Sequence, residues 1–92
     1  MTIDQTTVER CAEIARSFGA TRLILFGSSL ESPETARDLD LACEGVEGWD
    51  IFRLGAQLEE SLGTRVDLIP LRADDRFSRY VTAKGRVIYE SE

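Results

Sequence analysis

The chain has 92 residues and a formal net charge of −6, with 17 acidic residues, 11 basic residues and no histidine. This acidic balance disfavours nucleic acid as a partner, because a phosphate backbone would be repelled. No apolar stretch approaches the ~20 residues needed to span a bilayer, and the N-terminus lacks the features of a signal peptide. We therefore expect one small cytoplasmic domain, residues 1–92, with no membrane association.

The first half of the chain predicts a helix followed by two strands. Apolar residues recur at helical spacing from Val8 to Phe18, with a capping-box pair at Thr6 and Glu9 and a stop at Gly19. The continuous apolar run at 23–26 is typical of a central strand buried on both faces. The segment 38–42 reads DLDLA and alternates with period two, which predicts a strand with its leucines facing the core.

The second half predicts a helix over 50–62 that ends at Gly63, then a strand over 65–70 that ends at Pro70. A short helix capped by Asp74 and ended by Gly85 follows, and a last strand covers 86–90. The order is α-β-β-α-β-α-β. We expect an α/β (α+β) fold with a small mixed sheet of three to four strands.

Three aspartates fall on neighbouring strands of this predicted sheet. The connection from 38–42 through a helix to 65–70 is a βαβ unit, whose right-handed crossover places the two strands parallel and adjacent. Asp38 and Asp40 then share one face, and Asp67 comes up beside them on the next strand, ~4.8 Å away. Two unit charges ~5 Å apart repel by about 3 kcal/mol at an effective dielectric of ~20. A cation would relieve this repulsion, and Mg²⁺ suits an all-oxygen site that also binds phosphates.

The Gly27-Ser28 pair directly after the first predicted strand is compatible with the same chemistry. A glycine at this position lets the backbone approach a ligand closely, and the Ser28 hydroxyl is available to a phosphate oxygen. If the residues after it begin a helical turn, their free N–H groups would point at an anion. Each feature alone is usually structural: most Gly-Ser pairs are turns, and most Asp-x-Asp pairs are solvated.

The combination resembles the nucleotidyltransferase superfamily of DNA polymerase beta type, and specifically its minimal prokaryotic members, the MNT proteins. Gly27 and Ser28 match the family's Gly-Ser pair, Asp38 and Asp40 its Asp-x-Asp pair, and Asp67 its third acidic residue. The resemblance covers almost the whole chain. It implies a polymerase beta-like fold and a Mg²⁺ (or Mn²⁺) site at Asp38, Asp40 and Asp67. It also implies transfer of a nucleoside monophosphate, AMP from ATP, to a tyrosine of a HEPN-type toxin, with this chain as the antitoxin.

Two departures from the family pattern leave an alternative open. Nine residues separate Ser28 from Asp38, one fewer than the commonest family spacing. The family often has a basic residue and then a glycine after Gly-Ser, whereas this chain has Ser29-Leu30-Glu31-Ser32, and Glu34 adds a further negative charge. Arg37 offers partial compensation. The alternative is a binding-only antitoxin of the same fold. A third option, modification of a small molecule as by aminoglycoside nucleotidyltransferases, requires segments that this short chain lacks.

Two further groups of residues have competing interpretations. Cys11 and Cys43 lie in apolar patterns without a CxxC spacing, which favours buried free thiols over a zinc site. Four aromatic residues either belong to the core or form a partner-binding patch on a thin domain: Trp49, Phe52, Phe77 and Tyr80.

Overall fold

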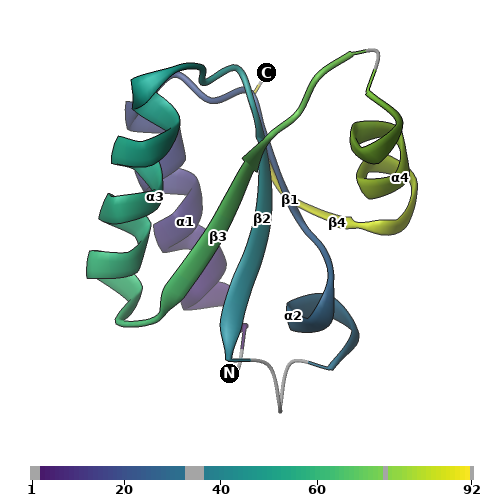
Figure 1. The fold of residues 1–92 in the computed structure, drawn as a ribbon. Helices are drawn as coiled ribbons and strands as arrows, with labels where there is room; N and C mark the ends of the chain where they lie inside the picture. The colour runs from purple at the N-terminus through teal and green to yellow at the C-terminus, as the bar shows by residue number, and fades with distance from the viewer. Residues whose placement is uncertain (1–2, 33–36, 74, 92) are drawn as a thin grey trace.

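A computed structural model of the chain describes residues 3–32, 37–73 and 75–91. Helices and strands follow one another along the chain (Figure 1): α1 (Gln5–Ser17), β1 (Arg22–Leu25), α2 (Ser28–Glu31), β2 (Asp38–Glu44), α3 (Trp49–Leu62), β3 (Arg65–Pro70), α4 (Arg76–Lys84) and β4 (Arg86–Glu90). The predicted elements are all present. The one addition is α2, a single turn directly after Gly27.

The strands form one mixed sheet in the order β3-β2-β1-β4. β2 and β3 are parallel, as the βαβ connection predicts, whereas β1 runs antiparallel to both of its neighbours, β2 and β4. The mixed four-stranded sheet confirms the predicted fold class.

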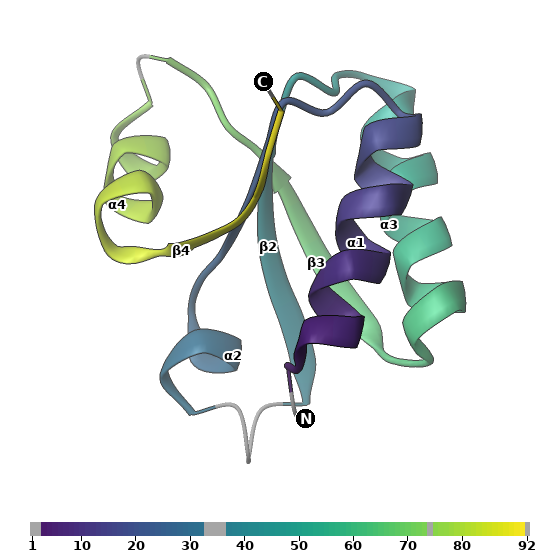
Figure 2. The ribbon, with the colours of Figure 1, turned by 180° about the vertical axis from the view of Figure 1, so that it is seen from behind.

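The two faces of the sheet are covered unequally. α1 and α3 lie side by side on one face, and α4 lies on the other (Figures 1 and 2). The larger core is on the α1/α3 side, where Leu39 and Leu41 of β2 are buried as predicted. Ile24 of β1 faces the opposite way and packs with Ala42 and Val81 beneath α4. β1 is therefore buried on both faces, while the α4 side has only a small apolar cluster.

Two helix starts differ from the prediction. α1 is capped by Asp4, whose side chain accepts a hydrogen bond from the Thr7 N–H, and not by Thr6. α4 is capped by Asp75, not by Asp74, which lies outside the described residues. At the start of α1, aspartate is a stronger capping residue than threonine. At the start of α4, the two neighbouring aspartates are equally good capping residues, and the second of them takes the position. None of the helices in the described ranges is long and apolar enough to cross a membrane.

Candidate active site

The register between β2 and β3 places three aspartates on one face of the sheet. Asp40 lies directly opposite Asp67, and Asp38 lies opposite Arg65. Paired residues of parallel strands point to the same side, and Asp38 and Asp40 share that side by alternation. The predicted proximity of these three residues along neighbouring strands is thus confirmed.

Of the helices in the described ranges, α4 does not reach this end of the sheet, and the single turn α2 lies beside β2 there (Figure 1). α4 packs over Ile24 and Ala42, farther along the same face (Figure 1). Asp38 and Asp40 are half-buried and Asp67 is exposed. The carboxylates therefore face an open surface that a ligand can reach.

Gly27 lies against one of the three carboxylates. Its backbone has φ 67° and ψ −150°, a conformation that is essentially restricted to glycine. A Cβ at this position would lie 2.6 Å from Oδ2 of Asp40. Both the backbone conformation and the contact with Asp40 therefore require a glycine here.

Ser28 is the first residue of α2 and also faces Asp40. Its hydroxyl lies 3.5 Å from Asp40 Oδ2, at the long limit for a hydrogen bond. The Ser28 backbone N–H lies near the same carboxylate and helps to lower the pKa of Asp40.

Electrostatic effects single out Asp40 among the three acids. Burial raises the pKa of Asp40, and the negative charges of Asp67 and then Asp38 raise it further. Hydrogen bonds from Ser28 partly offset these effects. The contributions of Asp67 and Asp38 to this raised pKa reflect repulsion between neighbouring carboxylates, which a cation bound among them would relieve.

The donor set fits Mg²⁺ in chemistry, but the side chains are not gathered into a ready-made metal cluster. Carboxylate oxygens are the ligands that this ion prefers. Within the described ranges, however, no three acidic or cysteine side chains are arranged to hold one ion together. The three backbone positions are adjacent in the sheet, so binding an ion between these carboxylates requires their side chains to rearrange.

Arg65 is a candidate site residue that the sequence analysis missed. A shallow hollow of about 190 Å³ is lined by Asp38, Arg65, Val66 and Asp67. Among the described residues, no ion pair involving Arg65 is formed. Alternation along 65–67 would have placed Arg65 on the Asp67 face. Arg37, which we considered instead, is exposed, and its backbone carbonyl accepts a hydrogen bond from Thr64.

The remaining expectations concern acidic residues, cysteines and aromatic residues. Glu31 is exposed on α2, and Glu34 lies outside the described residues. Cys11 and Cys43 are free and buried, as predicted, and burial raises the pKa of each thiol to about 11. Neither thiol is a reactive group at neutral pH.

The four aromatic residues form neither a shared patch nor part of the core. Trp49, Phe52 and Tyr80 are 81%, 69% and 57% exposed. Trp49 contacts Phe52 on α3, whereas Phe77 of α4 packs edge-to-face on Phe26. α3 and α4 lie on opposite sides of the sheet (Figures 1 and 2), which rules out one patch containing all four residues.

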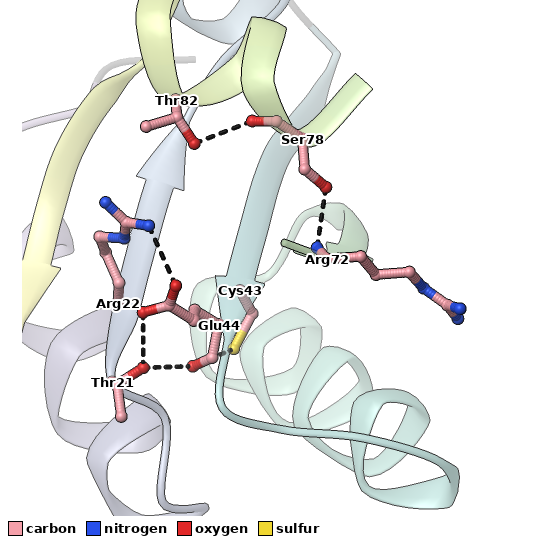
Figure 3. A network of polar contacts seen from close by, with 7 residues as sticks. All are labelled: Thr21, Arg22, Cys43, Glu44, Arg72, Ser78 and Thr82. Atoms are coloured by element: carbon pink, nitrogen blue, oxygen red, sulfur yellow. Dashed lines mark hydrogen bonds and ion pairs between the residues drawn. The ribbon is translucent and has the colours of Figure 1, made fainter. Parts of the chain in front are cut away.

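A larger hollow, of about 490 Å³, lies on the α4 side, around Glu44 at the far end of β2. Its polar groups bond to one another (Figure 3): Arg22 pairs with Glu44 at 3.0 Å, and the Arg72 N–H donates to the Ser78 hydroxyl at 2.8 Å. The Arg72 guanidinium points away from Glu44 (Figure 3). The first contact joins β1 to β2, and the second joins the segment after β3 to α4. Because these polar groups are already paired with one another, the carboxylate face is the better candidate although its hollow is smaller.

The fold is that of solved toxin–antitoxin proteins. The MntA-HepT toxin–antitoxin matches with a TM-score of 0.73 and 18% identity over 96% of this chain and 74% of the matching chain. The complex of a tri-AMPylated HEPN toxin with its MNT antitoxin, from Shewanella oneidensis, matches with a TM-score of 0.74 and 19% identity over 97% and 74%. A toxin–antitoxin structure with AMP-PNP matches with a TM-score of 0.74 and 18% identity over 98% of this chain and 76% of the matching chain.

These similarities establish the MNT nucleotidyltransferase-like fold, as the sequence predicted. No family model and no curated protein matches the sequence.

Proposed function

We propose that this chain is a Mg²⁺-dependent nucleotidyltransferase that transfers AMP from ATP to a tyrosine hydroxyl of a HEPN-type toxin, and thereby acts as its antitoxin. The observation that carries the proposal is the register of Asp40 opposite Asp67, with Asp38 beside them and Gly27 against Asp40. The fold relatives support the partner and the nucleotide, because one is an MNT antitoxin with an AMPylated HEPN toxin and another holds AMP-PNP. We place this reaction in the cytoplasm, where ATP is available.

In this proposal each residue of the open face has a separate role. Asp38 and Asp40, together with Asp67 on the neighbouring strand, would hold Mg²⁺ (or Mn²⁺), which would neutralise charge on the transferred phosphoryl group. Gly27 allows the triphosphate to approach the backbone, and the Ser28 hydroxyl turns from Asp40 to a phosphate oxygen. Arg65, opposite Asp38, adds positive charge to this acidic face.

Asp67 is placed to accept the proton of the attacking hydroxyl. The acceptor oxygen bonds to the α-phosphorus while the bond from that phosphorus to the oxygen bridging the β-phosphate breaks. Pyrophosphate leaves with the electron pair, and the hydroxyl proton passes to Asp67. Asp67 suits this role because it is the most exposed of the three acids and lies on the strand at the edge of the sheet.

A binding-only antitoxin is the second candidate. It is favoured by the absence of a ready-made ligand cluster in the described ranges and by the acidic Glu31 next to the turn. This candidate keeps the fold and the toxin partner but has no turnover.

A label-transfer experiment separates the two candidates. The chain is incubated with a HEPN-type partner, Mg²⁺ and ATP labelled at either the α- or the γ-phosphate. The nucleotidyltransferase places the α-label, and not the γ-label, on a tyrosine of the partner. Complex formation without label from either ATP would support the binding-only antitoxin and contradict our proposal. A matched Asp38→Asn chain controls for label introduced by a contaminating enzyme.

A further inference from the structure

Ser29 is a polar side chain that is buried directly beside the candidate site. It lies in α2 and is 1% exposed, whereas the preceding Ser28 is exposed. Its hydroxyl donates to the backbone carbonyl of Phe26 at 2.9 Å and accepts from the backbone N–H of Asp40 at 3.0 Å. The side chain therefore links the end of β1 to the strand that carries the Asp-x-Asp pair.

The two Ser29 hydrogen bonds lie where β1 leaves the sheet. The ladder between β1 and β2 ends at the pair Leu25–Leu41, and the chain then turns away at Gly27. Beyond that point the Phe26 N–H donates to the Asp40 carbonyl at 3.1 Å. The Ser29 hydroxyl satisfies the Asp40 N–H, for which the departing strand offers no carbonyl. Both backbone groups of Asp40 are thus held by the segment that forms the turn.

We propose that Ser29 is a positioning residue that clamps the Gly27–Ser28 turn to Asp40. The clamp fixes the distance between the groups that face a triphosphate and the carboxylate that binds the metal. Ser29 itself touches neither ligand, because it is buried under the turn. The inference rests on the proposed function, since it concerns how this site is held ready for a metal–nucleotide complex.

The chain contains a matched control in Ser78. This serine is also buried, at 4% exposure, and its hydroxyl also accepts from a backbone N–H, that of Arg72 at 2.8 Å. Ser78 lies in α4, near the other end of the β2 strand from Asp38. Replacing either serine by alanine removes a comparable buried hydrogen-bonding group, but only one of them adjoins the candidate site.

The test measures binding of AMP-PNP with Mn²⁺ by calorimetry, on full-length variants that are shown by circular dichroism to be folded. We expect Ser29→Ala to weaken binding at least about tenfold, because the turn and Asp40 separate. Ser78→Ala should change it less than about twofold. Ser29→Cys retains a weak hydrogen-bonding group, so its affinity for AMP-PNP with Mn²⁺ should lie between the affinities of the wild type and Ser29→Ala. If the alanine variant does not fold, Ser29→Cys replaces it in the test.

A second readout follows the clamp without any ligand. Amide hydrogen exchange of Asp40 should accelerate in the Ser29 variants and stay unchanged in Ser78→Ala. Wild-type affinity in Ser29→Ala, or equal losses in Ser29→Ala and Ser78→Ala, overturns the positioning role while the proposed function stands. Failure of the wild-type chain to bind AMP-PNP with Mn²⁺ overturns the proposed function itself, and the role of Ser29 in it.

Discussion

Removing the charge of Asp67 should stabilise the metal-free protein. Asp67 faces Asp40 across two parallel strands, and its charge raises the pKa of Asp40. For carboxylates about 6 Å apart, with a dielectric of about 40–80 because Asp67 is exposed, Coulomb's law gives a repulsion of about 1 kcal/mol. Asp67→Asn should raise the free energy of unfolding by this amount at pH 7, a rise in Tm of about 4–8 °C for a domain of this size.

The pH dependence gives this prediction a signature. Asp40 has a raised pKa in the folded state, so its contribution to stability is fully present below the ordinary value of 3.8 and is lost as the pH rises through the raised value. The gain from Asp67→Asn should therefore be present at pH 7 and vanish below pH 3.8, where Asp40 is protonated.

Urea unfolding in the presence of EDTA measures this gain, and a charge-matched variant controls for the net charge of −6. Glu60→Gln removes one exposed charge from α3, on the opposite side of the sheet. With Mg²⁺ added, the wild type should become more stable to urea than Asp67→Asn, because Mg²⁺ binding stabilises the wild type more than the variant. An Asp67→Asn gain equal to that of Glu60→Gln, or one that persists below pH 3.8, would refute the reasoning.

Three further changes test the site and the fold. Gly27→Ala should lower the free energy of unfolding by about 1–3 kcal/mol, because an alanine is strained at this positive φ. Its Cβ should also displace the Asp40 carboxylate, so calorimetry should show at least tenfold weaker binding of AMP-PNP with Mn²⁺. Unchanged affinity would argue against close approach of the nucleotide at the turn. Arg65→Ala should weaken the same binding, more at low salt, while Arg37→Ala should not; equal effects would remove Arg65 from the site. Asp75→Ala should lower the free energy of unfolding by about 1 kcal/mol in urea titrations, because the α4 cap is lost, and no change would contradict the cap.

The helices and strands were predictable because their periodicity and stop signals are strong. The pattern over 65–70 and 86–90 gave both strands with the bounds that the structure has. The register of Asp40 against Asp67 was also predictable, since a βαβ unit leaves few alternatives. Helix starts were less predictable, because Asp74 and Asp75 are equally good capping residues and the sequence offers no ground for choosing between them.

The sequence contained no signal for Ser29. A serine after a Gly-Ser turn is ordinarily solvated, and only the departure of β1 from the sheet creates the unsatisfied Asp40 N–H that buries it. The positions of the aromatic side chains were also not predictable from the sequence, because they too depend on how the elements pack. Trp49 and Phe52 occur at the start of an amphipathic helix, but Ile51, Leu54 and Leu58 fill the core side of α3, which leaves the two rings outside.

Metal-dependent nucleotide binding tests the central claim most directly, because it requires no knowledge of the acceptor. AMP-PNP is titrated into the wild-type chain with Mg²⁺ or with EDTA, and into a chain with Asp38→Asn and Asp40→Asn. Our account predicts binding by the wild type that requires the ion and is lost in the double variant, which should itself be folded and more stable without metal. Binding that is independent of the ion, or that survives in the double variant, would contradict a metal–nucleotide site on this face of the sheet.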